Sequence, residues 1–462
     1  MSVVDVHRRE RIRERVVREL GPEGVLPPGD GPAPESPAPA VAAPVSDAEV
    51  AAVLRLAGEE GWRVLPVGAG LSPRYGSEAD LELSSRRRRG SPEHEPGDLV
   101  ATVQAGVTLG DLDDALRREG QWLPLDPPAW PWATVGGVVG SGLGGPLAQA
   151  YGRPRDQVLG LTLVDGQGRV LKLGGRVVKN VAGFDLVRLA VGSRGALGVV
   201  TSVSFRLYPV PADDRTLVWE ADDPEGAWAL GRRLARLPIP VAALEIVCLE
   251  VQGKGARVHG GSSPLGPGYH RVLARVVGSA GAAERMAREL EAAGRAPDRP
   301  GKGPDGALGW NELAEDEGRG EMVLRARSLP DVGGSLLEAA SALGSALRDL
   351  GWEWTRAALR PGTGELRLSA GGNPDPGSGY REPDPGAAPD PGLRALAAFR
   401  EAVEGLEGTV RVLRLPAHLP DARRRATSLS TSTAPGVAKL QRGLRKAFDP
   451  RGILPGAWKE GC

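Results

Sequence analysis

Two glycine-rich stretches carry the residues whose spacing suggests chemistry. The first, PVGAGLSPRYG, covers residues 66–76 and follows WRVLPV, a predicted short strand. Glycines let a loop bend tightly and turn successive backbone N–H groups toward one point, and such a concavity binds a diphosphate without a cationic side chain. An ordinary turn has the same composition, so this loop alone leaves a ligand site and a plain turn as alternatives.

The second stretch, GGVVGSGLGG, covers residues 136–145 and contains a formal G-x-G-x-x-G at Gly140, Gly142 and Gly145. A dinucleotide fingerprint leaves a strand, opens a helix and has an acidic residue about twenty positions on. Here two further glycines come first, Pro146 follows, and Asp165 sits in a predicted hairpin turn. We therefore reject a Rossmann-type nicotinamide site.

Metal and cluster ligands are scarce in this chain. Its two cysteines, Cys248 and Cys462, are too few for an iron–sulfur cluster or a four-cysteine zinc site. No two histidines are close enough in sequence to come from one helix turn, and we expect no metal site; they are His7, His94, His259, His270 and His418.

The composition argues against several other classes of function. Fifty-eight basic and 58 acidic residues cancel, which gives no overall attraction to nucleic acid or to an anionic membrane. No apolar run reaches the roughly 18 residues of a spanning helix. The arginine-rich start contains Glu10, Glu14 and Glu19, unlike a transit peptide. We expect a cytoplasmic protein of two or three domains.

The elements that must position the glycine loops can be predicted from caps and periodicity. Ser46 and Glu49 begin a helix that Gly61 ends, and the strand 62–67 follows. A strand at 99–104 precedes a helix whose N-cap is Thr108. Residues 157–174 form a hairpin about Asp165, and a strand at 198–210 closes this α/β part.

The second half alternates strands with helices more loosely. We predict strands at 269–279, 321–331 and 408–416, each next to an amphipathic helix. This pattern favours an α+β lobe with helices on one face of a mainly antiparallel sheet. The run GGNPDPGSGYREPDPGAAPDPG at 371–392 is predicted as a loop excursion without chemistry.

Three further groups have both a functional and a structural interpretation. The run SSRRRRG at 84–90 could contact phosphate, but we expect a solvated loop. Three tryptophans could line a ligand surface, but we expect such large rings to be buried; they are Trp310, Trp352 and Trp354. Three arginines fit cross-strand ion pairs better than a carboxylate clamp, and these are Arg356, Arg360 and Arg414.

The combination of motifs resembles a known family. The loop at 66–76 and two longer stretches, DPPAWPWATVGGVVGSGLGGPLAQAYGRPRDQVLG at 126–160 and GGRVVKNVAGFDLVRLAVGSRGALGVVT at 174–201, resemble the FAD-binding domain of the vanillyl-alcohol oxidase and p-cresol methylhydroxylase (PCMH) flavoproteins. The run KNVAGFDLVRLAVGSRGALGVVT and the ending LRKAFDPRGILPG resemble the FAD-binding subunit of bacterial glycolate oxidase complexes.

This resemblance implies an α+β fold in three parts. Residues 1–44 would be an N-terminal helix with a Pro/Ala-rich linker, and residues 45–211 a two-part PCMH-type FAD-binding domain. Residues 212–462 would be an α+β cap domain with a mainly antiparallel sheet, whose C-terminal segment returns to the flavin domain.

The resemblance also implies which residues bind FAD. Backbone N–H groups of the first loop and the Ser72 hydroxyl would hold the pyrophosphate, while the second loop would lie along the pyrophosphate, ribityl chain and flavin edge, where larger side chains would collide with the cofactor. Val199 would contact it through its backbone. The set is Val67, Gly68, Ala69, Gly70, Leu71, Ser72, Thr134, Gly136, Gly137, Ser141, Gly142 and Val199.

Two departures from the family pattern refine this picture. Relatives that bind flavin covalently often have a histidine where this chain has Leu71, so we expect non-covalent FAD. A usual tyrosine is replaced by Phe184. A cation would stabilise anionic reduced flavin, and the candidates Lys179, Arg153 and Arg155 have a surface role as the simpler alternative. No catalytic residue is assigned.

The function implied is that of an FAD-dependent oxidoreductase subunit. It would belong to a glycolate-oxidase-type complex that oxidises a D-2-hydroxy acid, glycolate or D-lactate, to the 2-oxo acid. Its partners would be a second FAD-containing hydroxy-acid dehydrogenase subunit and an iron–sulfur subunit, through which the complex would associate peripherally with a membrane. The alternatives are a self-sufficient FAD-dependent dehydrogenase of a small hydroxy acid or alcohol, and a non-catalytic flavin-fold assembly subunit.

Overall fold

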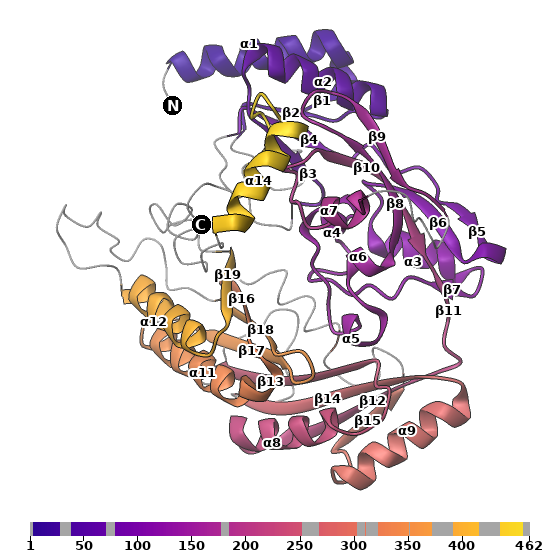
Figure 1. The fold of residues 1–462 in the computed structure, drawn as a ribbon, viewed down its shortest axis with the longest axis vertical. Helices are drawn as coiled ribbons and strands as arrows, with labels where there is room; N and C mark the ends of the chain where they lie inside the picture. The colour runs from indigo at the N-terminus through magenta and orange to yellow at the C-terminus, as the bar shows by residue number, and fades with distance from the viewer. Residues whose placement is uncertain are drawn as a thin grey trace. The chain divides into compact units, whose positions relative to one another are not determined.

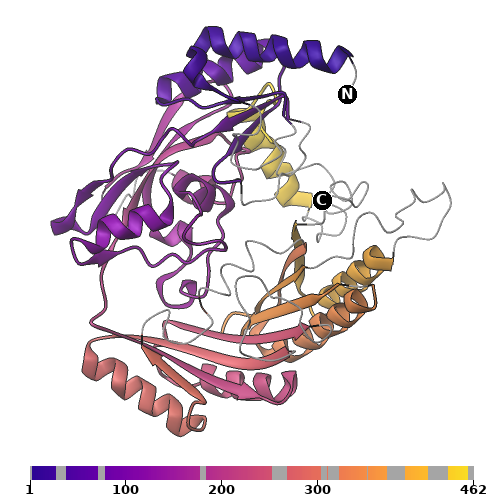
Figure 2. The same cartoon turned by 180° about the vertical axis from the view of Figure 1, so that it is seen from behind.

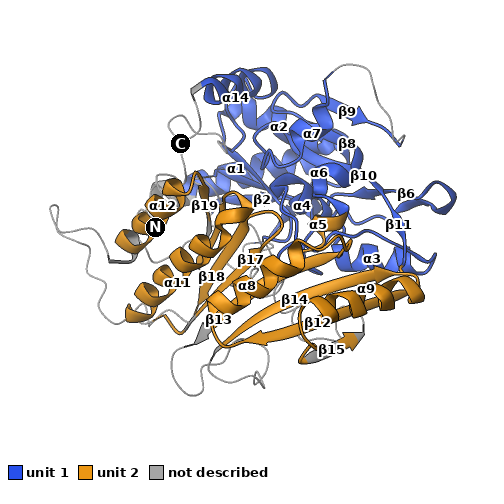
Figure 3. Cartoon of the chain, turned by 60° about the horizontal axis from the view of Figure 1, so that its bottom comes forward, with its two compact units in different colours: residues 1–145, 151–210, 433–461 blue, residues 146–150, 211–432, 462 orange. Residues whose placement is uncertain are grey.

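The structure is a computed structural model, and it describes residues 3–27, 38–70, 79–176, 184–251, 268–302, 310, 322–350, 352–371, 391–414 and 435–455. The chain forms two compact units, which Figure 3 shows in different colours. Unit 1 consists of residues 1–145, 151–210 and 433–461, and unit 2 of residues 146–150, 211–432 and 462. Unit 2 is therefore inserted between two parts of unit 1.

A small sheet in unit 1 supports the first glycine loop. Its strands, in the order β1-β2-β4-β3, are β1 (Val25–Leu26), β2 (Ala40–Ala42), β4 (Leu81–Ser84) and β3 (Val64–Val67). Strand β4 pairs in parallel with both β2 and β3. Helix α2 (Asp47–Glu60) makes the crossover from β2 to β3. Parallel strands need such a connection, so this part has α/β character.

Local sequence sets the ends of α2 as predicted. The Ser46 side chain accepts a hydrogen bond from the Glu49 amide, and Gly61 ends the helix with φ 68°. Glu49 in turn accepts a bond from the Val45 amide at 2.8 Å, one residue earlier than in a standard capping box. The apolar side of α2, including Val50 and Leu54, is fully buried.

Residues before 45 belong to unit 1, which corrects the expected domain boundary. Strand β2 lies between β1 and β4, and Ala40, Val41 and Ala42 are all buried. Helix α1 (Val3–Leu20) lies along α2 (Figure 2) and buries Ile12 and Val16. The Pro/Ala-rich composition concealed this strand because alanine is a poor strand former, and β2 forms by pairing with β4.

The arginine run at 84–90 is mostly exposed, as expected of a solvated loop, but Arg88 is an exception. The Arg88 guanidinium is buried and forms an ion pair with Asp47 at 2.6 Å. Arg87 donates to the backbone carbonyl oxygens of Glu23 and Ala43. Arg88 and the exposed Arg87 thus connect the end of β4 to the N-terminal elements.

A second, antiparallel sheet in unit 1 carries the second glycine stretch. Its order is β5-β6-β10-β8-β9, with β5 (Glu93–Glu95), β6 (Val100–Gln104), β10 (Val199–Arg206), β8 (Val158–Val164) and β9 (Val170–Gly174). Helices on it include α3 (Leu109–Arg117), α4 (Val135–Ser141), α6 (Pro154–Gln157) and α7 (Leu186–Ala190). The predicted strand at 99–104, the helix after Thr108 and the hairpin about Asp165 are confirmed.

Unit 2 is an α+β lobe, as its sequence predicts. Its antiparallel sheet has the order β15-β12-β14-β13-β17-β18-β16-β19. The strands are β12 (Asp213–Ala221), β13 (Ala243–Val251), β14 (Gly268–Gly278), β15 (Arg299–Lys302), β16 (Met322–Arg327), β17 (Trp354–Arg360), β18 (Glu365–Gly371) and β19 (Thr409–Arg414). Helices α8 (Pro224–Ala235), α9 (Ala280–Ala293), α11 (Gly333–Asp349) and α12 (Pro391–Gly405) cover one face (Figure 1).

The two faces of this sheet differ because side chains alternate along a strand. Leu244 and Ile246 pack in the core beneath the helices. Glu245 between them is fully buried on the other face, where it accepts hydrogen bonds from Arg360 at 2.7 Å and Arg367 at 3.2 Å. The expected cross-strand ion pair of Arg360 is thus confirmed.

The other large side chains singled out in this half have mixed outcomes. Trp310 and Trp352 are buried, as expected of large rings, and the Trp310 indole donates to Thr216 at 3.0 Å. Arg356 is also buried. The side chains of Trp354 and Arg414, and the loop at 372–390, lie outside the described residues.

Candidate functional site

The first glycine turn begins where β3 ends. Val67 is buried, and its carbonyl oxygen accepts a hydrogen bond from the Ser85 amide at 3.0 Å, which fixes the end of the strand beside β4. Gly68, Ala69 and Gly70 then leave the sheet half-buried, and Gly70 has φ 74°. This left-handed conformation favours glycine. The expected site residues Leu71 and Ser72 lie outside the described residues.

The second turn is the start of α4. Thr134 is buried as the N-cap, and its side chain accepts a hydrogen bond from the Gly137 amide at 3.3 Å. Val135, Val138 and Val139 face the core of unit 1. Gly137 and Gly140 lie on the opposite, half-buried side, so this side of the helix has almost no side-chain atoms.

The two turns touch each other. A Cβ atom placed on Gly68 would overlap the Thr134 hydroxyl and lie 3.7 Å from the Gly137 backbone nitrogen. A side chain at position 68 would therefore require the Thr134 hydroxyl to move. The sequence-based hypothesis requires the loop at 66–76 and the start of the 136–145 stretch to form one concave backbone surface, and they are in direct contact.

The glycines of α4 differ in what surrounds them within the protein. A Cβ on Gly136 would lie 2.9 Å from the Ala105 Cβ, so this glycine lets α4 approach the end of β6. Gly142 has φ 65° and packs against Gly192. A Cβ on Gly140, in contrast, would have no atom of the described residues within 4 Å.

Two other expected residues have local roles in the structure. The Ser141 hydroxyl donates to the Val138 carbonyl oxygen at 3.1 Å and accepts from the Leu143 amide at 3.3 Å. These bonds secure the end of α4. Val199 is the first residue of β10, where it pairs with Val164, and its buried side chain packs in the core of the small sheet.

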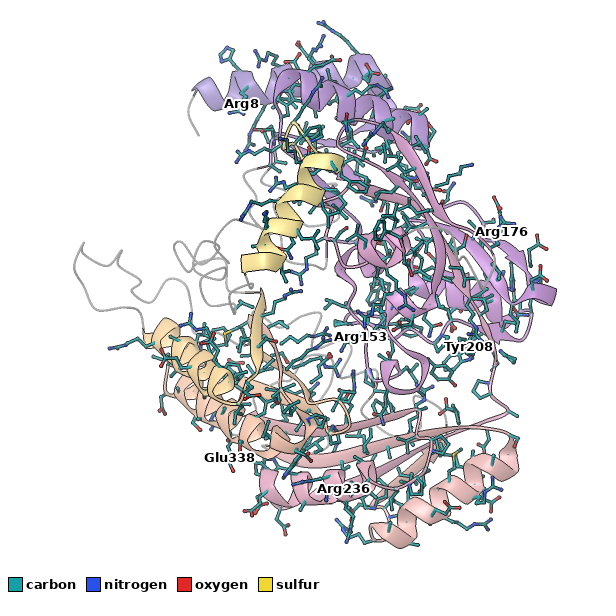
Figure 4. The ribbon with its side chains drawn as sticks, in the orientation of Figure 1. Arg8, Arg153, Arg176, Tyr208, Arg236 and Glu338 are labelled. Carbon is teal, nitrogen blue, oxygen red and sulfur yellow. The ribbon has the colours of Figure 1, made fainter. Side chains whose placement is uncertain are left out.

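The candidate cations occupy the start of α6 or lie outside the described part. Arg153 is the N-cap of this helix (Figure 4), and its amide donates to the Asp156 carboxylate at 2.9 Å. Arg155 is exposed along 60% of its side chain. Lys179 is not among the described residues, and Phe184 next to that gap is 93% exposed.

A turn at residues 191–195, which sequence reasoning did not assign, holds the two glycine turns together. The Gly192 and Arg194 amides donate to the carbonyl oxygens of Val139 at 2.9 Å and Gly140 at 2.8 Å, near the end of α4. A Cβ on Gly195 would lie 3.1 Å from the Pro66 ring on β3. In the sequence, the glycines of VGSRG at 191–195 were the only feature that could have indicated this turn.

Comparison with known families identifies the domain that contains both glycine turns. Residues 38–174 match the family described as FAD binding domain. These residues are an FAD-binding domain. Its cofactor is FAD, and both glycine turns lie within it. The start of the match at residue 38 agrees with the structural inclusion of β2.

The relatives of this FAD-binding domain act on hydroxy acids, according to their names. The chain is 40% identical over 168 residues to glycolate oxidase subunit GlcE of Escherichia coli, covering 35% of this chain and 46% of that one. It is 35% identical over 173 residues to GlcD of Bacillus subtilis, covering 37% of each. D-lactate dehydrogenase of Archaeoglobus fulgidus is 36% identical over 197 residues, covering 42% and 44%. The chain thus spans less than half the length of these relatives.

The fold as a whole has solved counterparts. Alkyldihydroxyacetonephosphate synthase, in two crystal forms, covers 91% of this chain with TM-scores of 0.61 and 0.60. The matches cover 76% and 77% of those chains at 17% and 16% identity, which shows a shared fold. The α+β, PCMH-type fold class expected from sequence is therefore confirmed. In the described parts of the chain, no helix has the length and apolar character to cross a membrane.

The residues present fit a flavin dinucleotide. The diphosphate of FAD needs N–H donors and close backbone approach, which a surface without Cβ atoms allows. Gly68 and Gly70, together with Gly137 and Gly140, give such a surface on two contacting turns. Valines on the buried side of α4 fix its position in the core.

Proposed function

We propose that this chain is the FAD-binding subunit of a glycolate-oxidase-type complex, which oxidises a D-2-hydroxy acid to the 2-oxo acid and passes the electrons onward. The contact between the Gly68 turn and Thr134 is the structural observation that supports an FAD site here. The relatives named as glycolate oxidase subunits support the reaction class. Glycolate and D-lactate are the substrates to test first.

The proposed FAD contacts are mainly backbone groups. Residues 67–71 offer N–H groups to the diphosphate with the Ser72 hydroxyl beside them, and Thr134, Gly136, Gly137, Ser141 and Gly142 line the second side. Val199 contributes backbone atoms. Bound FAD supplies a two-electron acceptor for oxidation of an alcohol carbon. We propose that the cofactor is held without a covalent bond, because Leu71 cannot form one.

The proposed protein partners come from the resemblance to glycolate oxidase complexes. We propose that electrons leaving the flavin pass to a separate iron–sulfur subunit, and that a second FAD-containing subunit supplies the hydroxy-acid dehydrogenase site. The two cysteines of this chain, too few to hold an iron–sulfur cluster on their own, agree with this division. The E. coli relative is a glycolate oxidase subunit by name, which supports a multi-subunit assembly.

One spectroscopic experiment tests the proposal. The purified chain should show flavin absorbance, and acid precipitation should release all of it as FAD into the supernatant, as expected of a non-covalent cofactor. Anaerobic addition of glycolate or D-lactate should bleach the flavin quickly only when the partner subunits are present. A chain that binds no flavin under any condition would refute the proposal.

A second candidate is a self-sufficient FAD-dependent dehydrogenase of a small hydroxy acid. The similarity to the A. fulgidus D-lactate dehydrogenase favours it. In that case D-lactate alone would bleach the flavin of the isolated chain anaerobically, and a soluble dye would reoxidise it. Bleaching that requires the partner subunits would instead support the complex.

A further inference from the structure

The C-terminal residues enter unit 1 far from the sequence of the FAD-binding domain. Helix α14 (Pro435–Phe448) is followed by residues 449–455, which we call the C-terminal clasp. Ile453 and Leu454 of the clasp are buried in the core of the small sheet together with Val64 of β3. The family match ends at residue 174 and does not include this segment.

Asp449 organises the clasp from inside. Its side chain is buried, and its two carboxylate oxygens accept separate backbone hydrogen bonds, from Ile453 at 3.0 Å and from Leu454 at 2.9 Å. The Gly452 amide donates to the Asp449 carbonyl oxygen at 3.1 Å, and Gly452 has φ 68°. One carboxylate therefore closes the whole turn.

Burial raises the pKa of Asp449, while hydrogen bonds from Leu454 and Ile453 and the charge of Arg445 act in the opposite direction. The Arg445 guanidinium also donates to the Leu454 carbonyl oxygen at 3.1 Å. Burying a carboxyl group away from solvent is unfavourable unless its partners are precisely placed. Asp449 is therefore held in the turn by partners on several sides.

The β8–β9 hairpin holds the other side of Asp449. The Gly166 amide donates to the Phe448 carbonyl oxygen at 3.0 Å, and a Cβ on Gly166 would lie 2.5 Å from the Asp449 carboxylate. The hairpin itself is fixed by Asp165, which is fully buried and accepts from the backbone amides of Gln167 and Arg169, each at 2.9 Å. The β8–β9 hairpin thus holds the start of the clasp in place.

From this hairpin the clasp reaches the first glycine turn. Strand β3 is at the edge of its sheet, and its Val64 amide donates to the Ile453 carbonyl oxygen at 2.7 Å. Three residues further along, β3 ends at Val67, where the glycine turn begins. The clasp therefore fixes the free edge of the strand that presents the turn.

The clasp also contacts the turn at 191–195 that supports α4. A Cβ on Gly195 would have the Pro66 ring at 3.1 Å and the Pro455 ring at 3.7 Å. Gly195 itself has φ 81°. Pro455 at the end of the clasp, Pro66 of β3 and the turn at 191–195 therefore meet around Gly195.

We propose that Asp449 is a positioning residue for the FAD diphosphate surface, acting through the C-terminal clasp on β3 and on the turn at 191–195. This inference rests on the proposed FAD site. It assigns a role in cofactor affinity to a carboxylate that does not contact the cofactor. The clasp is then a part of the FAD-binding site that the matched domain lacks.

The test compares Asp449→Asn with wild type in the full chain. Asparagine keeps the size but has one acceptor oxygen, so one of the two backbone amides loses its partner. We expect FAD to bind to the apoprotein about tenfold more weakly, the effect of losing one hydrogen bond to a charged group. The control Asp113→Asn removes a surface ion pair with Arg117 on α3 and should leave the FAD affinity unchanged.

Hydrogen exchange of the apoprotein gives a readout that does not depend on bound FAD. In Asp449→Asn, exchange should rise in peptides that contain residues 62–70 and 135–142, and stay unchanged in β6 and β8. A merely structural role would raise exchange throughout unit 1 and lower its melting temperature without a selective loss of FAD affinity. That result would overturn the inference.

A second variant covers the case in which Asp449→Asn does not fold. Gly166→Ala displaces the Asp449 carboxylate from the hairpin side while keeping both of its oxygens, and it should weaken FAD binding in the same direction. Full FAD affinity with unchanged exchange at 62–70 in this variant would contradict the inference. If wild type bound no FAD, the proposed function would fail, while the exchange pattern would still decide whether the clasp positions the turns.

Discussion

At the scale of single residues, Glu365 shows how unit 2 accommodates a buried charge. Glu365 on β18 is nearly fully buried, 3.1 Å from Arg325 and 2.9 Å from Arg327. Burial alone would raise the pKa of Glu365, but the combined charges of Arg325, Arg360, Arg327 and Arg367 bring it below the ordinary value. The ionised carboxylate is therefore a structural part of unit 2.

We predict that Glu365→Gln destabilises unit 2 by about 3–5 kcal/mol at neutral pH, because breaking a buried ion pair leaves uncompensated charge. The depressed pKa means that the wild-type contribution is present above the unfolded-state pKa and is lost as the pH falls through the folded-state value. The difference between variant and wild type in urea unfolding should therefore shrink in acid.

The matched control for this prediction is Glu338→Gln. Glu338 is exposed on α11 (Figure 4) and should change the unfolding free energy by less than about 0.5 kcal/mol. Equal effects of the two substitutions, or a Glu365 effect that grows in acid, would contradict the proposed role of the buried carboxylate.

Cys248 gives a second prediction at this scale. Burial in the core of unit 2 raises the pKa of its thiol to about 12. The thiolate is the reactive form, so a neutral-pH alkylating reagent should not modify Cys248 in the folded protein and should modify it fully in denaturant. Peptide mass spectrometry would detect the adduct. Rapid labelling under native conditions would show that this part of unit 2 opens.

At the scale of elements, α4 is a helix whose buried side is built of valines and whose other side is built of glycines. Glycine in a helix costs about 1 kcal/mol relative to alanine, so a protein core alone does not explain Gly140. A Cβ atom at this position would lie more than 4 Å from every atom of the described residues around it. If FAD binds along this side of α4, as proposed above, close approach of the cofactor would account for this unfavourable helix residue.

We predict that Gly140→Ala raises the stability of the apoprotein by up to about 1 kcal/mol and weakens FAD binding. Flavin titration and thermal unfolding of the apoprotein measure the two effects separately. The control Gly443→Ala lies in α14, where the added Cβ also meets no atom of the described chain within 4 Å, and should stabilise without changing FAD affinity. Unchanged FAD binding in Gly140→Ala would show that the cofactor does not approach this side of α4.

Elements also show the limits of prediction from sequence. Helix α2 could be placed because Ser46 and Gly61 act on their own neighbours. Strand β2 could not, because its alanines and valine become a strand only by pairing with β4. The turn at 191–195 belongs to a motif that the sequence shows, but its contact with Pro66 depends on the fold of unit 1.

At the scale of the whole molecule, unit 2 interrupts unit 1. The chain leaves unit 1 after residue 210 and returns at residue 433, so α14 and the C-terminal clasp complete a domain that began at the N-terminus. Ile453 and Leu454 fill part of its core, and each buried aliphatic side chain contributes about 1.5–3 kcal/mol. The last residues are therefore needed for the stability of the first domain.

We predict that a chain ending at residue 432 loses stability in unit 1 and retains no FAD, while unit 2 keeps its own unfolding transition. Differential scanning calorimetry of the two chains would separate these transitions. The side chains of unit 2 pack in their own core, which the truncation does not touch. A truncated chain with wild-type flavin content would contradict this view of the C-terminal segment.

The sequence by itself determined the local features of this protein: the caps of α2 and α3, the hairpin about Asp165, the alternation of the unit 2 strands and the glycine loops that resemble an FAD-binding domain. These depend on residues a few positions apart, whose interactions the chain itself imposes. Only the tertiary structure decided that Gly68 packs against Thr134 and that Asp449 holds a strand edge near Val64. Such contacts join segments far apart in the chain, and they form where burial of both surfaces outweighs the entropy of closing the loop between them.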